Sequence, residues 1–302
     1  MIRFAACLLG LAAFAAEPAP PSPESREDIL DRGASLGFIP LASPAAGHDL
    51  GLYLEGFFRD DAGKVPAAIP AKARRLADHL TEYRAAGATH LVFVYQEDEA
   101  EAEHLRLLLL GDFGEDAQRR LEGAGLGRRG AAGSFELLAC KDGEEAVGAA
   151  SWPPLPIARL AALAEKVAPA SSGSVDFIDL RRKDAPEACL EALREAFAED
   201  GQPPEKADVP PRARQLVEAI PFLRTQGARQ LVVTAHQNAK GADVVLVVAQ
   251  GAFAPDVQVR LRAMFASHGT EDGVVVLRRW VDGEEKGAGP PVTEPRRNPP
   301  KK

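Results

Sequence analysis

The sequence contains few of the residues that mark metal sites or nucleic-acid-binding surfaces. Its six histidines show none of the H-x-H, H-x-x-x-H or H-E-x-x-H spacings of zinc sites. Lysine and arginine total 36 against 44 aspartates and glutamates, a formal net charge of −8. A nucleic-acid-binding surface needs an excess of basic side chains that displace counterions. The sequence therefore argues against a nucleic-acid partner, and we expect no metal or other cofactor.

The chain also lacks a long apolar run. Its main apolar segment, Ala5–Ala16, follows Arg3 and is too short to span a hydrocarbon core of ~30 Å. Ala13 and Ala15 stand at the −3 and −1 positions of a cleavage before Ala16. We therefore predict a signal peptide over residues 1–15, export to the periplasm or beyond, and no transmembrane segment. A buried N-terminal helix is the alternative.

Cysteine is scarce too. The predicted mature chain retains only Cys140 and Cys189, too few to scaffold a fold of this size with disulfides. Two buried thiols are the favoured interpretation, because unpaired cysteine behaves as a small apolar residue. A disulfide between them remains open, since export permits one.

The sequence does contain an internal repeat. A shift of 140 positions places Pro70–Glu145 on Pro210–Glu285 without a gap, and 22 of the 76 aligned positions are identical. Both stretches carry Arg-x-x-Gly-Ala, then Leu-Val, Gly-x-Phe-x-x-Asp and finally Asp-Gly-Glu-Glu. Two copies of one α/β module are therefore predicted.

Each copy is predicted to contain two helices and four strands after a leading helix. Leu76, Leu80 and Tyr83 follow helical spacing and precede Gly87, a typical helix-ending residue. The order is β-α-β-β-α-β, so we predict an α+β fold of two tandem ferredoxin-like modules with their sheets packed or joined. The leading helices are predicted at 24–36 and 157–167, strand one at 50–58 and 175–182, strand two at 89–96 and 229–236, strand three at 105–110 and 243–249, and strand four at 134–140 and 274–281.

The predicted boundaries follow from the repeat and from composition. The second copy is expected to carry an extra helical segment at about 184–209, and the Pro-rich, basic end is expected to be disordered. The predicted organisation is a signal peptide at 1–15, a Pro-rich leader at 16–25, copy one at 26–150, copy two at 151–285 and the tail at 286–302.

Two glycine motifs are interpreted as coincidences. Gly33–Gly37 matches the G-x-S-x-G of hydrolase nucleophile elbows, but a helical pattern precedes Ser35 where a strand is required. Gly125–Gly130 matches G-x-G-x-x-G, but it leaves a helix instead of opening one. Arg128 and Arg129 beside it could bind an anion, although solvated surface is the favoured interpretation. No catalytic, cofactor-binding or metal-binding residue is assigned, and any binding site is unknown.

A dense acidic run, Glu97–Glu103, lies at the tip of the first predicted hairpin. It lacks the spacing and the glycine of a calcium loop. A charged tip that keeps the hairpin from pairing with other chains is therefore favoured over a cation site.

The Arg-x-x-Gly-Ala-x-x-Leu-Val stretch, followed by an apolar hairpin and Gly-x-Phe, resembles a group of uncharacterised exported proteins of planctomycete-type bacteria. The resemblance covers much of Pro70–Glu145 and Pro210–Glu285. It implies export and tandem α/β modules, and it implies no activity.

Three functions are compatible with these features. The first is an exported, non-catalytic protein that binds a protein or another envelope component. The second is a solute-binding module with a pocket between the two copies. The third, an exported hydrolase, has only the Ser35 motif in its favour. The sequence does not name a ligand or an oligomeric state.

Overall fold

The computed structural model describes residues 29–59, 64–66, 68–97, 102–130, 134–142, 144–145, 155–198, 202–265 and 273–286. The predicted signal peptide and Pro-rich leader, and all of the predicted tail except Lys286, lie outside the described residues.

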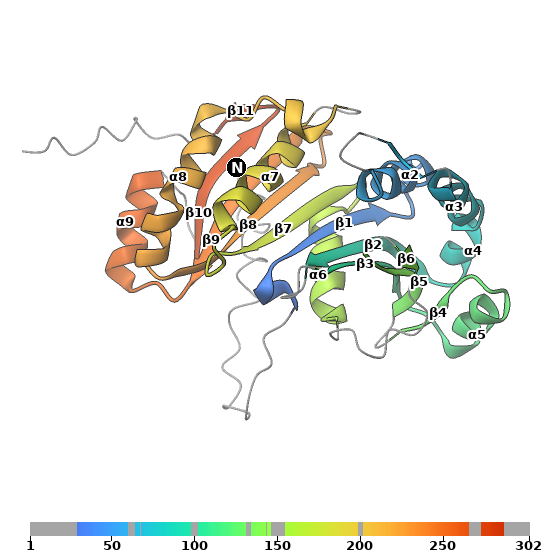
Figure 1. Cartoon of the computed structure of the whole chain (residues 1–302). Helices are drawn as coiled ribbons and strands as arrows, with labels where there is room; N and C mark the ends of the chain where they lie inside the picture. Colours follow the sequence, from blue (N-terminus) through green and yellow to red (C-terminus); the bar gives the residue numbers. More distant parts are fainter. Residues whose placement is uncertain are drawn as a thin grey trace, which may run out of the picture.

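The described residues form one antiparallel sheet of eleven strands that extends through both halves, in the order β11-β10-β9-β8-β7-β1-β2-β3-β5-β4, with β6 beside β5 (Figure 1). The first half supplies six strands: β1 (Ala34–Pro40), β2 (Ala88–Glu97), β3 (Glu103–Gly111), β4 (Arg128–Arg129), β5 (Ser134–Lys141) and β6 (Glu144–Glu145). The second half supplies five: β7 (Gly173–Asp179), β8 (Ala228–Gln237), β9 (Asp243–Gly251), β10 (Val274–Val281) and β11 (Glu284–Glu285).

The two halves join through β1 and β7, which we call the seam. These strands pair antiparallel, from Ala34 opposite Phe177 to Phe38 opposite Gly173. The predicted joining of the two sheets is therefore correct. Because β1 and β7 also pair with β2 and β8 on their other sides, backbone hydrogen bonding continues without a break from one half to the other.

Among the described residues, seven helices cover one face of the sheet, as Figure 1 shows for their arrangement. In both halves, buried apolar residues of these helices share a core with the strands beneath them. The helices are α2 (Ala46–Phe57), α3 (Ala68–Asp78), α4 (Leu80–Ala85) and α5 (Glu115–Gly123) in the first half, and α7 (Ala185–Phe197), α8 (Pro211–Thr225) and α9 (Pro255–Phe265) in the second. A short 3-10 turn, η2 (Pro204–Lys206), precedes α8.

The opposite face is covered at its centre by α6 (Ile157–Val167) and the short turn η1 (Ile29–Arg32). Leu160 and Leu163 of α6 are buried against apolar residues from both halves of the sheet. Two polar side chains anchor this layer at positions 140 residues apart: His90 bonds the carbonyl of Ala168 at 3.0 Å, and Gln230 donates to the carbonyl of Leu30. The third main strand of each half, β3 or β9, carries apolar side chains on both sides because both faces of the sheet are covered there.

The strand order contradicts ferredoxin-like modules. In that topology strands one and three lie at the centre of each sheet, whereas here the four main strands of each half lie in chain order, as β1-β2-β3-β5 and β7-β8-β9-β10. The prediction failed because the pattern of elements along the chain does not determine which strands become neighbours.

Two element predictions in the first half are also wrong. Residues 50–57 of the predicted strand 50–58 belong to α2, in which Ala46, Leu50 and Leu54 recur every fourth residue and are buried. The predicted leading helix 24–36 is, in its described part, the η1 turn followed by β1. Gly33, with φ of +98°, connects η1 to β1 in a conformation that glycine adopts easily.

These corrections change the relation between the two halves. Helix α7, predicted to be part of an extra segment at 184–209, follows β7 as α2 follows β1. A shift of 139 positions aligns Ser35, Phe38 and Ile39 of β1 with Ser174, Phe177 and Ile178 of β7. The segment 184–209 therefore has a counterpart in the first half. The described order in each half is a strand, helices, two strands, a helix and a further strand.

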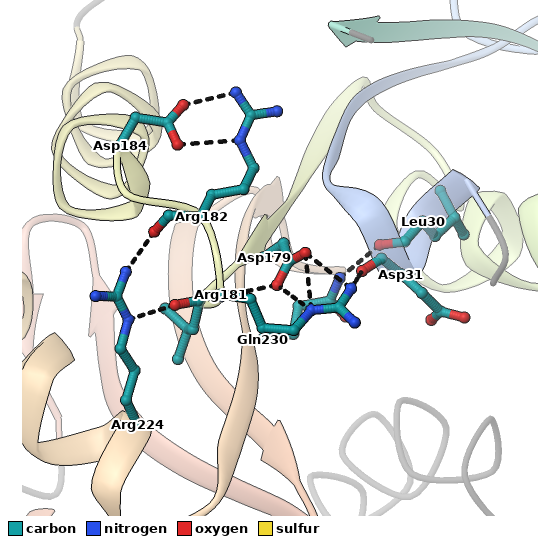
Figure 2. Close-up of polar contacts among 9 residues, drawn as sticks. Leu30, Asp31, Asp179, Arg181, Arg182, Asp184, Arg224 and Gln230 are labelled. Atoms are coloured by element: carbon teal, nitrogen blue, oxygen red, sulfur yellow. Dashed lines mark hydrogen bonds and ion pairs between the residues drawn. The ribbon is translucent and has the colours of Figure 1, made fainter. Parts of the chain in front are cut away.

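Polar contacts reinforce the junction of the halves (Figure 2). Arg181 bonds the carboxylate of Asp179 and reaches the carbonyl of Asp31 at 3.4 Å. Arg182 pairs with Asp184 and, 2.9 Å away, with Glu97 at the end of β2 in the first half. Arg224 donates to the carbonyls of Leu180 and Arg182 and so fixes the loop between them.

Gly173 tests the close contact between the seam and α6. A Cβ atom at this position would lie 2.8 Å from the carbonyl oxygen of Val167 and 3.1 Å from that of Ala235. We expect Gly173→Ala to lower the free energy of unfolding by about 1–3 kcal/mol, because neither backbone atom can move without disturbing α6 or the sheet. Denaturant unfolding measures the effect. Gly51→Ala in α2 is the control, since no atom lies within 4 Å of its added Cβ. Equal stability of the two variants would contradict a tight contact.

Candidate functional site

A pocket of about 600 Å³ lies within the first half, and we call it the first-half pocket. One wall is formed by α3 and α4, the other by the segment Gly125–Arg128 after α5, and β5 contributes Glu136–Ala139. The volume lies in the range of small-molecule sites in proteins. The lining residues are Ala71, Lys72, Arg75, Leu76, His79, Tyr83, Gly125, Leu126, Gly127, Arg128, Glu136, Leu137, Leu138 and Ala139.

The helical wall presents polar groups in a regular series. Lys72, Arg75, His79 and Tyr83 are spaced three or four residues apart, so they lie along one side of the helical segment. His79 is paired with Glu82. Two other members of the series, Lys72 and Arg75, are basic residues.

The opposite wall adds an arginine that is held in place by a buried carboxylate. The guanidinium of Arg128 donates to Glu136 at 2.5 Å, and Arg106 donates to the other carboxylate oxygen of Glu136 at 2.8 Å. Glu136 is only 4 % exposed, whereas Arg128 is 38 % exposed. Two guanidinium groups thus share one carboxylate.

Tyr83 is fully buried, and its hydroxyl group has no hydrogen-bond partner. Burial raises the pKa of this phenol to about 12, with a further contribution from Glu82 and an opposing one from Arg75. A buried hydroxyl without a partner costs free energy, and such groups are uncommon in folded proteins. Tyr83 was predicted only as part of the apolar face of its helix, and its sequence context gave no sign of an unsatisfied hydroxyl.

The equivalent place in the second half has a different side chain. Leu138 on β5 lies opposite Leu107 of β3 in the strand register. In the second half, Arg278 on β10 holds the same position, 140 residues later, opposite Val247 of β9. Arg278 bonds the carbonyl of Phe265 at 3.1 Å and lies 3.3 Å from Glu285. Arg212 of α8 also reaches Glu285, at 2.9 Å.

The residues facing the pocket from the helix differ between the halves as well. Arg75, His79 and Tyr83 correspond to Gln215, Ala219 and Leu223 at the same shift. Several side chains that line the pocket are therefore replaced by different ones in the second half.

The glycine motif at 125–130 contributes backbone to this pocket. Gly127 approaches β5 so closely that an added Cβ would lie 2.4 Å from the carbonyl oxygen of Glu136. The motif follows α5 and leads into β4, as expected for a loop and not for a dinucleotide fingerprint. Of the two arginines predicted as solvated surface, Arg128 lines the pocket and Arg129 pairs with Glu122.

Ser35 lies within strand β1, not at a turn between a strand and a helix, so its surroundings differ from those of a nucleophile elbow. Its hydroxyl bonds Asp176, the residue opposite it on β7. Burial raises the pKa of Asp176 to about 6, against the effect of this hydrogen bond and with added repulsion from Glu191.

Further acidic and phenolic groups surround Asp176 at the seam. Glu195 on α7 is exposed at the surface. Its pKa is raised to about 8, chiefly because the surrounding protein restricts hydration of the carboxylate, and further by repulsion from Asp176 and Glu191. Tyr53 of α2 donates to the carbonyl of Gly173 at 3.2 Å. In the described part of the chain, no group of three or more histidine, cysteine, aspartate or glutamate residues could hold a metal ion.

The two cysteines do not form a disulfide. Cys140 is buried in the core of the first half and Cys189 in that of the second. Burial, with a contribution from Asp176, raises the pKa of the Cys189 thiol to about 12, so this thiol remains protonated and a poor nucleophile at neutral pH. The prediction of two buried thiols is confirmed.

The acidic run at the hairpin tip lies only partly within the described residues. Glu97 ends β2 and pairs with Arg182, and Glu103 begins β3. The residues 98–101 between them lie outside the described ranges.

Comparisons do not assign the chain to a known family. No family model, curated protein or solved structure matches it. None of the helices that the structure describes is both long enough and apolar enough to cross a membrane. The function is therefore inferred from the geometry of the residues.

Removing the Tyr83 hydroxyl should stabilise the protein without ligand. We expect Tyr83→Phe to raise the free energy of unfolding by about 1 kcal/mol, because it removes a buried group that makes no hydrogen bond. Urea unfolding measures the change. Tyr53→Phe is the matched control and should lower stability, since it deletes the bond to Gly173. A loss of stability in Tyr83→Phe would show that its hydroxyl does have a partner.

Asp176, which is buried at the seam, should make stability depend on pH. Its folded-state pKa is raised to about 6, so the folded chain keeps a proton that the unfolded chain releases as pH rises above about 4. The free energy of unfolding should therefore fall between about pH 4 and pH 6. Asp176→Asn should make this fall shallower, as measured by thermal unfolding across the range. Asp116→Asn, at an exposed position in α5, should leave the slope unchanged. The same slope in Asp176→Asn and the parent protein would refute the assignment.

Proposed function

We propose that this protein is an exported, non-catalytic binding protein, and that it holds a small ligand in the first-half pocket. The observation that carries the proposal is the difference between the two halves at one position of the fold. Leu138 lines the pocket in the first half, whereas the corresponding residue of the second half is Arg278, which bonds the carbonyl of Phe265.

The pocket is better suited to binding than to catalysis. Covalent catalysis by a side chain needs a nucleophile beside a base that a third group orients. The carboxylate in the lining, Glu136, is bonded to Arg106 and Arg128, and the imidazole, His79, is paired with Glu82. Ser35, the residue behind the hydrolase alternative, lies at the seam and outside this lining.

The solute-binding alternative agrees with this pocket in the type of site but not in its position. A pocket between the two copies was expected, whereas the first-half pocket lies wholly within one of them. The groups that do gather between the halves, Asp176 and Glu195, are acids whose pKa values are raised. Binding of a protein or an envelope component on another surface remains the second candidate.

Export and duplication belong to the same proposal. Export rests on the sequence of residues 1–16 and on the resemblance to exported planctomycete-type proteins. Duplication is supported by the 22 identities at a constant shift and by the equivalent order of elements in the two halves. A duplicated module would explain how one copy kept a filled core while the other acquired a pocket.

Native mass spectrometry of the chain purified from an export-competent bacterial host tests the proposal. We expect a mature form beginning at Ala16 that carries a reproducible added mass from a bound molecule. Leu138→Arg, which introduces the residue found at the corresponding position of the second half, should lack this added mass.

Two results would contradict the proposal. A chain that still begins at Met1 in the cytoplasm would rule out export. An added mass that Leu138→Arg retains, while its circular dichroism spectrum matches that of the parent, would exclude the first-half pocket as the binding site.

A further inference from the structure

The first-half pocket has cationic side chains on both of its walls. The chain has a formal net charge of −8, but Lys72 and Arg75 lie on one wall of the pocket and Arg128 lies on the other. Arg128 is held in place by Glu136, which also bonds Arg106, and Arg75 is exposed to solvent. A negatively charged group between the two walls would therefore be attracted from both sides.

The remaining surface of the pocket is largely apolar. Leu76 on the helical wall, Leu126 on the opposite wall and Leu138 on β5 line it together with Leu137 and Ala139. Of these, Leu76 and Leu138 belong to the buried core of the first half. Such a surface favours a hydrocarbon body on a ligand, since contact removes apolar area from water on both molecules.

Resting on the proposed binding function, we infer that the ligand is an anionic amphiphile. Its carboxylate or phosphate head lies between Lys72, Arg75 and Arg128, and its apolar body packs against Leu76, Leu126 and Leu138. Arginine suits this role because its planar guanidinium can donate two parallel hydrogen bonds to a carboxylate or a phosphate. The head and the body are both required, since the cations and the leucines line the same space.

Calorimetric titration of the full mature chain tests this inference with five probes below their micelle-forming concentrations. Decanoate and decyl phosphate supply the two possible anionic heads, and a clear preference between them identifies the source of the charge. Decylamine and decanol keep the apolar body with a positive or a neutral head. Inorganic phosphate supplies the anion alone. We expect saturable binding of decanoate, of decyl phosphate or of both, at one site per chain, and at least about tenfold weaker binding of the other three probes.

Three variants locate the binding. Arg75→Glu should weaken binding of the anionic probes by about tenfold or more. Arg74→Glu makes the same change of charge at the neighbouring exposed residue, which does not line the pocket, and should bind like the parent. Leu138→Arg should abolish binding by filling the apolar part of the pocket. Because Arg75 is exposed, its substitution is not expected to impair folding.

The failures of the inference and of the proposed function are distinguishable. Equal binding of decylamine or decanol, or equal weakening by Arg74→Glu and Arg75→Glu, would overturn the anionic class of the ligand. Binding of inorganic phosphate as strongly as decyl phosphate would overturn the role of the apolar body. If none of the probes binds while the purified protein still carries a molecule that Leu138→Arg lacks, the proposed function stands and the ligand class is wrong.

Discussion

The antiparallel pairing of β1 with β7 is the interaction on which the rest of this structure depends. Each of these strands would otherwise be an exposed edge, with unpaired backbone groups open to other chains. Joining them leaves the edges of one long sheet at β4–β6 and at β11, where the strands are only two residues long. The seam thus removes two long edges, and it makes the two halves one structural unit.

The seam also explains the second layer of the molecule. A continuous sheet offers a broad apolar face around its centre, and α6, the helix that connects the two halves, covers it together with η1. His90 and Gln230 bond carbonyl groups on the two sides of this layer. The connection between the halves is consequently part of the core, so truncation at this helix would expose the centre of the sheet in both halves.

Within this frame the two halves differ where a function can reside. Near the seam, the ring of Tyr53 on α2 packs over Gly37 of β1. At the shift of 139 positions, the corresponding residues of the second half are Ala192 on α7 and Asp176 on β7. Between the helices and the last long strand, Leu138 is exchanged for Arg278. The first exchange lies beside the seam, whereas the second changes a side chain that lines the first-half pocket.

The sequence by itself determined most of the local structure. Strands at 89–96, 105–110 and 134–140, their counterparts in the second half and helix α6 were all predicted, because alternation, helical spacing and glycine positions are local properties. Residues 50–58 were mistaken for a strand because an apolar run with aromatic residues also suits a sheet. The helix is favoured only by the four-residue spacing of Ala46, Leu50 and Leu54, which pack in one cluster with residues of α3 and β1.

Only the tertiary structure decided the strand order and the pocket. Strand order depends on pairing between distant segments, and the pocket depends on whether the side chain at one strand position fills the space between two helices. Neither is encoded in the spacing of neighbouring residues, so Tyr83 and Leu138 seemed ordinary core residues until the fold placed them beside a cavity.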